Sequence, residues 1–88
     1  MAKTTTKKMV RAVCVIDRGW IFAGDLVEKS GRIYLSRVVH VFSWPGGGFA
    51  AMVADPKAVK ADLRPCADMN FPVGCEIFRV PVGITWGL

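Results

Sequence analysis

Metal ligands are the first residues to test in this 88-residue sequence, because it contains three cysteines and one histidine. Cys66 and Cys75 are separated by eight residues, and Cys14 and His40 lie far from both in the sequence. Zinc sites usually pair their ligands at shorter spacings such as C-x2-C. The sequence therefore predicts no bound metal and no cofactor, and the cysteines are expected to serve as small apolar groups of the core.

Nucleophilic catalysis requires a serine or cysteine beside a base. His40 is the only histidine, and none of Ser30, Ser36 and Ser43 stands in a G-x-S-x-G elbow. The aspartates are scattered and mostly occupy expected turns, where their ordinary role is to accept local hydrogen bonds. This pattern predicts that the protein is not an enzyme.

Three successive glycines offer another kind of chemistry, the binding of an anion by backbone N–H groups. Gly46, Gly47 and Gly48 precede a segment that can begin a helix at Phe49, and helix N-termini attract phosphates. However, no lysine follows in the pattern G-x-x-x-x-G-K-[ST], and Pro45 departs from that pattern as well. A flexible bend between a strand and a helix is the favoured interpretation, and binding of an anion or small nucleotide is the alternative.

The three tryptophans, Trp20, Trp44 and Trp86, are numerous for so short a chain. Tryptophans either fill a small core, with each indole N–H hydrogen-bonded, or anchor a partner at a surface. Trp44 stands beside the glycines, and we expect its side chain to be the most exposed of the three. The predicted partner-binding surface consists of Trp44, Gly46, Gly47, Gly48, Phe49 and Trp86.

Positive charge is concentrated at the start of the sequence. The formal net charge is +5, and the first eleven residues hold four basic and no acidic side chains. The remaining residues carry eight basic and seven acidic side chains, so the body of the protein is nearly neutral. We expect residues 1–9 to form a flexible basic tail. In a nucleic-acid-binding protein, the tether to phosphates would consist of Lys3, Lys7, Lys8 and Arg11.

Alternating apolar residues and turn signals predict a single β-rich domain over residues 10–88. The segment 10–17 is apolar on both faces of a strand, and the segment 20–28 is a second strand interrupted by Gly24. A glycine inside a strand indicates a bulge or a sharp bend. The dipeptide Ser30-Gly31 then predicts a hairpin. It is followed by one long bent strand or two short strands before the glycines.

The second half of the sequence predicts less regular structure. A short helix is expected at 49–54, followed by a turn in which Asp55 is the N-cap and Pro56 the first residue. Residues 63–74 are expected to hold irregular chain or a short edge strand, and then a turn. The closing strand is expected at 75–80, with Pro81 ending its pairing or placing it at an edge. The final segment, which carries Trp86, is apolar enough to dock on the domain.

These elements predict a mainly β fold, a small antiparallel barrel or curled sheet of SH3-like or OB-like size with one short helical segment. Apolar residues make up 52% of the chain, which excludes a disordered protein. A domain this small and apolar is expected to complete its burial by binding a second copy of itself, as a homo-oligomer, or by binding a partner. The sequence contains neither a signal peptide nor an apolar run of membrane-spanning length, so we expect a cytoplasmic protein with no membrane contact.

A family resemblance adds to this interpretation. The segment Arg18-Gly19-Trp20-Ile21-Phe22-Ala23-Gly24, the later Trp44 with its glycines and the final Trp86-Gly87 resemble a group of small proteins of tailed bacteriophages. The resemblance implies a non-enzymatic phage accessory protein in the cytoplasm of the bacterial host. Such a protein would bind and occlude or sequester a host or defence component, above all a protein. The resemblance carries over no catalytic or ligand residues.

Two other functions stay open from the sequence. The first is a nucleic-acid-binding β-barrel with a basic N-terminal tether, which predicts affinity that falls steeply with salt. The second is a component of the virion or of its assembly, which predicts large stable oligomers.

Overall fold

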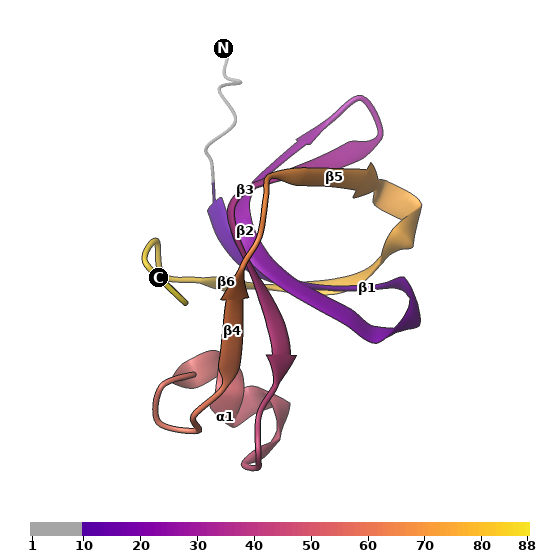
Figure 1. Ribbon diagram of the computed structural model, residues 1–88. Coiled ribbons are helices and arrows are strands. Elements are labelled where there is room, and N and C mark those ends of the chain that lie inside the picture. Colours follow the sequence, from indigo (N-terminus) through magenta and orange to yellow (C-terminus); the bar gives the residue numbers. More distant parts are fainter. Residues whose placement is uncertain (1–9) are drawn as a thin grey trace.

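The computed structural model describes residues 10–88. The elements are the strands β1 (Val10–Ile16), β2 (Trp20–Lys29), β3 (Arg32–Ser43), β4 (Asp62–Pro65), β5 (Met69–Pro72) and β6 (Glu76–Val82), the helix α1 (Gly48–Ala54) and the 3-10 turns η2 (Asp17–Gly19) and η3 (Val73–Cys75). The strands form one antiparallel sheet in the order β4-β3-β2-β1-β6, and β5 also pairs with β3. Figure 1 shows the sheet curling, with β5 facing β1 across the interior. The predicted mainly β fold with one short helix is confirmed as a curled sheet that does not close.

A bulge bends β3 and allows this one strand to pair with two edge strands. The register between β2 and β3 shifts between Ala23 and Asp25, so Arg37 and Val38 lie opposite the single residue Gly24. The first half of β3 pairs with β5 and the second half with β4. The predicted irregularity at Gly24 is confirmed, but the extra residue lies on β3, where Arg37 adopts a φ of 47°.

Gly24 leaves no room for a side chain between β2 and β3, and its substitution gives a first testable prediction. A Cβ atom added there would lie 3.0 Å from the backbone oxygen of Ser36 and 3.1 Å from the Cβ of Leu35. We expect Gly24→Ala to lower the free energy of unfolding by about 1–3 kcal/mol, measured by urea denaturation. Gly83→Ala is the control, because nothing lies within 4 Å of a Cβ at Gly83. Equal effects of the two substitutions would contradict the close approach.

Two of the predicted turns form as expected. Ser30 and Gly31 have φ angles of 52° and 77°, which is the geometry of a two-residue type I′ hairpin. After α1, an Oδ1 atom of Asp55 accepts a hydrogen bond of 3.2 Å from the N–H of Ala58, as an N-cap residue does. Local sequence therefore determines both chain reversals.

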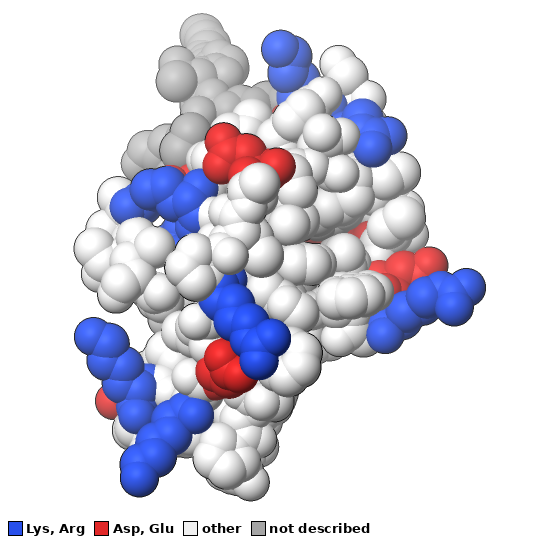
Figure 2. Space-filling model, viewed as in Figure 1, with Lys and Arg blue, Asp and Glu red and all other residues white. Residues whose placement is uncertain are grey.

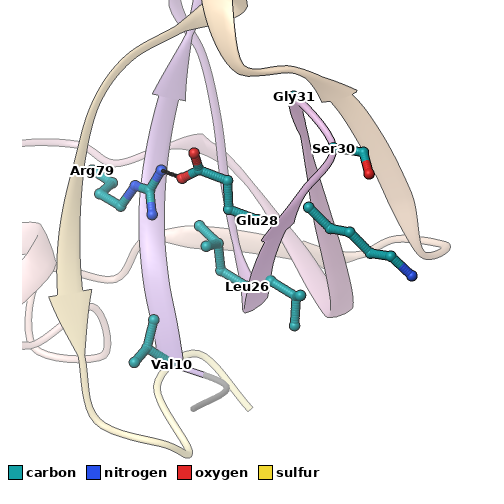
Figure 3. A pocket seen from close by; sticks show the side chains of 8 residues that line it. Val10, Leu26, Glu28, Ser30, Gly31 and Arg79 are labelled. Atoms are coloured by element: carbon teal, nitrogen blue, oxygen red, sulfur yellow. Dashed lines mark hydrogen bonds and ion pairs between the residues drawn. The ribbon is translucent and has the colours of Figure 1, made fainter. Parts of the chain in front are cut away.

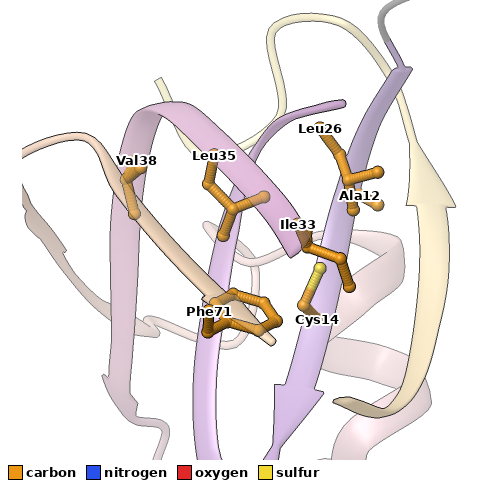
Figure 4. Close-up of a cluster of buried hydrophobic side chains, with 7 residues drawn as sticks. All are labelled: Ala12, Cys14, Leu26, Ile33, Leu35, Val38 and Phe71. Atoms are coloured by element: carbon orange, nitrogen blue, oxygen red, sulfur yellow. The ribbon is translucent and has the colours of Figure 1, made fainter. Parts of the chain in front are cut away.

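The curled sheet buries side chains on both of its faces. The first cluster fills the inside of the curl (Figure 4) and consists of Ala12, Cys14, Leu26, Ile33, Leu35, Val38 and Phe71. The second cluster lies on the other face, where Val13, Ala23 and Val39 pack under α1 and the C-terminal tail. Successive residues of β1 thus contribute to opposite clusters, which confirms that this strand is apolar on both faces.

The C-terminal tail docks, as its composition predicts. The indole N–H of Trp86 donates a 2.8 Å hydrogen bond to the carbonyl of Val53 in α1. Two backbone carbonyls of the tail accept hydrogen bonds from arginines of the sheet. Arg11 Nε donates to the Trp86 oxygen at 2.7 Å, and Arg37 Nη2 donates to the Ile84 oxygen at 2.8 Å. The tail is therefore an integral part of the fold.

The segment after the helix is more regular than expected. It contains the two short edge strands β4 and β5, and the turn predicted at residues 71–74 begins later, with η3. Phe71 belongs to β5 because it pairs with Ile33 and is buried in the first cluster. Tertiary burial thus overrides the turn preference of Pro72 and Gly74. Within residues 10–88, no helix has the length and apolar character needed to cross a bilayer.

Candidate functional site

Five side chains from three neighbouring strands form an exposed cluster that we call the aromatic face. Phe22 on β2 pairs with His40 on β3, and His40 pairs with Arg64 on β4. Residues two positions apart in a strand point to the same side of the sheet. Trp20 therefore lies beside Phe22, and Phe42 lies beside His40. The aromatic face consists of Trp20, Phe22, His40, Phe42 and Arg64.

The rings of the aromatic face contact one another. The Trp20 and Phe22 rings are stacked, with centroids 6.0 Å apart and planes 8° apart. The His40 ring on β3 contacts both rings of β2, with its centroid 5.4 Å from that of Trp20 and 5.0 Å from that of Phe22. The edge of one ring meets the face of the other in the His40–Phe42 pair, at 5.8 Å. These are the distances and orientations that aromatic pairs favour.

The aromatic face is anchored at its centre and open at its ends. Phe22 packs against the first core cluster, so the centre of the face is fixed to the core. Trp20 and Phe42 are 51% and 54% exposed, although each is large and apolar. Such exposed rings, gathered in one place rather than scattered, are typical of a binding surface.

Arg64 adds a positive charge to the aromatic face. Its guanidinium carbon lies 3.7 Å from the centroid of the Phe42 ring, which is a cation–π contact. Arg64 also donates to both carboxylate oxygens of Asp62, at 3.2 Å and 2.9 Å. The hydrogen bond to Asp62 raises the pKa of Arg64 above its ordinary value. The face therefore combines flat rings with a permanently charged guanidinium.

The three aromatic residues predicted from sequence to bind a partner, Trp44, Phe49 and Trp86, are all partly buried in the fold. Trp44 and Phe49 are together, with ring centroids 6.3 Å apart, and Phe49 also meets Phe78 edge-on. Both residues are partly buried, so the prediction that Trp44 is the most exposed tryptophan is wrong. Trp20 is the exposed tryptophan, because it lies at the end of β2 beyond the core, whereas Trp44 packs on the helix start. Trp86 is also partly buried and packs against the second core cluster, as Phe49 does.

The glycine loop is exposed and leads into α1. Gly47 and Gly48 have φ angles of 96° and 80°, which explains why glycines are needed here. No side chain caps the helix start. Next to it, an apolar hollow of about 300 Å³ is lined by Phe49, Ala50, Val53, Ala54 and Val80.

Of the four residues predicted to tether phosphates, only Arg11 lies within the residues that the structure describes. Lys3, Lys7 and Lys8 lie outside the described residues. Arg11 is buried, with 3% exposure, on β1, which lies between β2 and β6 in the sheet. Its Nη1 atom donates to Asp25 Oδ1 at 3.2 Å, and its Nε atom holds the tail at Trp86. We therefore correct the assignment of Arg11, whose guanidinium is engaged inside the fold.

The thiols are positioned as core groups. Burial, and then the nearby Glu76 carboxylate, raises the pKa of Cys14 to about 12, so this thiol stays protonated near neutral pH. Cys66 and Cys75 are partly buried and pack against the first core cluster, to which Cys14 belongs. Among residues 10–88, no three His, Cys, Asp or Glu side chains gather in a way that could hold a metal ion.

A larger hollow, of about 480 Å³, lies beside the β2–β3 hairpin (Figure 3). Its lining mixes apolar residues such as Val10 and Leu26 with the charged pair Glu28 and Arg79. The two charges are 3.1 Å apart, and Arg79 also pairs with Glu76 at 2.7 Å. The hydrogen bond to Glu76 raises the pKa of Arg79. Glu28 and Arg79 are thus engaged with each other, and Lys29 also lines the hollow. We place the candidate site at the aromatic face because two large rings, Trp20 and Phe42, are exposed there side by side with other rings.

Comparisons with known proteins found no relative of this chain. No family model, no curated protein and no solved structure matches this chain.

Reasoning from the sequence missed the aromatic face as a unit. The signal present in the sequence is two pairs of rings at alternate positions, Trp20 with Phe22 and His40 with Phe42. Alternation shows that each pair shares one side of its strand. Only the register of β2 against β3 brings the two pairs together.

Proposed function

We propose that the protein is a non-enzymatic binding module of a tailed bacteriophage, that it acts in the host cytoplasm, and that the aromatic face is its contact surface. On this proposal, the module occludes or sequesters a bacterial host or defence component. The observation that carries the proposal is the gathering of half-exposed Trp20 and Phe42 with Arg64 on one side of the sheet. Tryptophan and arginine are the residues in which binding energy is most often concentrated.

The chemistry of the aromatic face supports binding rather than catalysis. His40 contacts three rings, and Arg64 is paired with Asp62. Among residues 10–88, no serine or cysteine side chain is hydrogen-bonded to His40. Partner binding needs only the rings and the guanidinium. A homo-oligomeric state, a host or defence protein as the partner, and a role in the virion stay predictions from the sequence.

The test compares ring variants of the full chain in capture from bacterial lysate, with and without nuclease treatment. We expect Trp20→Ala and Phe42→Ala each to weaken capture of the retained component at least tenfold, because hot-spot rings contribute about 2 kcal/mol or more. Tyr34→Ala is the matched control, since Tyr34 is 42% exposed but lies outside the aromatic face. Capture that survives both ring substitutions would overturn the proposal, as would the absence of any retained component.

A further inference from the structure

The aromatic face has the features of a platform for stacked bases. This inference rests on the proposed function above and names the class of its partner. We infer that the occupant is a single-stranded nucleic acid, whose bases stack on the rings of Trp20 and Phe42 and whose phosphates are met by arginines at the edge of the rings.

The rings present flat surfaces that are already held in place. Phe22 supports the Trp20 indole from one side, with the two planes only 8° apart. Phe22 is itself packed on the core, so the indole is backed by a fixed ring. Base stacking on such rings tolerates any sequence because every base has a flat aromatic surface. A surface of this kind pays little ordering entropy when a base is added.

One arginine lies over a ring of the aromatic face, and a second precedes the rings in the sequence. The Arg64 guanidinium lies over Phe42 and forms an exposed ion pair with Asp62, in which the Arg64 and Asp62 side chains are 54% and 43% exposed. Exposed pairs contribute little, so a phosphate can compete for this guanidinium. The second arginine is Arg18, which is exposed in the turn η2, two positions before Trp20, and forms no ion pair with an acidic side chain among residues 10–88.

The charge of the chain fits a polyanion, but its distribution favours a single strand over a duplex. The net charge of +5 and isoelectric point near 9.5 attract nucleic acid, but four of these five charges come from residues 1–11, and residues 12–88 are nearly neutral. On the face seen in Figure 2, however, Lys and Arg side chains are dispersed, and several stand next to Asp or Glu. Duplex binding depends mainly on phosphate contacts. With so few aligned cations, the rings must supply the affinity, and only unpaired bases can reach them.

These observations favour nucleic acid over a protein as the occupant. Rings and a guanidinium on one face, in a chain whose net charge is positive, are the features that single-strand-binding proteins combine. A protein interface calls for the first two only. A protein occupant is therefore an outcome of the test rather than a second proposal.

The experiment measures fluorescence anisotropy of a labelled oligothymidine of about twelve nucleotides, within the usual site size of small β-barrels. The full chain is titrated at low and at moderate salt. We expect Trp20→Ala and Phe42→Ala each to raise the dissociation constant about 5- to 150-fold, the range that stacking of one base provides. We expect a duplex of the same length to bind more weakly than the single strand, and Tyr34→Ala to bind like the parent protein.

Three outcomes would overturn the inference. They are an absence of oligonucleotide binding, equal affinity of parent and ring variants, and tighter binding of the duplex. The comparison with lysate capture separates this inference from the function on which it rests. If capture needs Trp20 and Phe42 but the oligonucleotide does not bind, the inference is wrong, the partner is a protein, and the binding module stands. If neither assay depends on the rings, both are wrong.

Discussion

Replacing Asp25 with alanine is expected to lower the free energy of unfolding by about 3–5 kcal/mol, out of the ~5–15 kcal/mol typical of a folded domain. The Asp25 carboxylate accepts hydrogen bonds from Arg11 Nη1 at 3.2 Å and Arg37 Nη2 at 3.0 Å. The Arg11 side chain has no exposed surface. Removing the carboxylate therefore leaves a buried cation without its counter-charge. Urea denaturation measures the effect.

The control for this substitution is an exposed ion pair of the same protein. Asp62 pairs with Arg64, and the Asp62 side chain is 43% exposed compared with 10% for Asp25. We expect Asp62→Ala to change the free energy of unfolding by less than about 1 kcal/mol. Comparable losses for Asp25→Ala and Asp62→Ala would contradict the role of burial.

The same carboxylate gives the fold a defined dependence on pH. Hydrogen bonds from Arg37, and then from Arg11, hold the pKa of Asp25 below its ordinary value of 3.8. The native state therefore binds this proton less tightly than the unfolded chain. The ion pair stabilises the fold fully above the ordinary value, and this stabilisation is lost as the pH falls through the lower native pKa. Unfolding free energies of the parent and of Asp25→Asn should converge in acid and differ most near neutral pH.

Trp86→Ala is expected to be the second severe substitution, with a loss of about 3 kcal/mol in the free energy of unfolding. The indole packs on the second core cluster and donates to the Val53 carbonyl. Trp86→Phe keeps most of the packing but removes the donor, so we expect an intermediate loss. Thermal unfolding followed by circular dichroism measures both. A stable Trp86→Ala variant would show that the indole does not hold the tail.

Features determined by neighbouring residues could be predicted from the sequence. The hairpin at Ser30-Gly31 follows from the ease with which glycine adopts a positive φ angle, and the cap at Asp55 from the hydrogen bond its side chain makes three residues later. The apolar pattern of residues 10–17 predicted a strand buried on both faces, and β1 is that strand. In each case the deciding contact lies within a few residues of the chain.

Features that depend on register could not be predicted. Arg11 lies in a basic stretch of sequence, and only its pairing with Asp25 across β1 and β2 shows that its charge is neutralised inside the fold. In the same way, nothing near Arg37 marks it as the bulged residue that sends β3 toward two partners. The exposure of Trp20 rather than Trp44 also follows from tertiary packing. Long-range pairing therefore decides which groups of this chain are available to a partner.

The pairing of the last strand with the first has a consequence for the kinetics of folding. β6 completes the sheet beside β1, and Arg11 binds the carbonyl of Trp86, 75 residues further along the chain. Closing so long a loop costs conformational entropy before any contact compensates it, so this step is expected to be late and slow. Until it occurs, β1 presents an open edge with a cation that lacks its final acceptor. During synthesis, this edge of β1 stays open until β6 and the residues after it have been made. While it is open, the β1 edge is the part of an incomplete chain that is most prone to pair with a second chain.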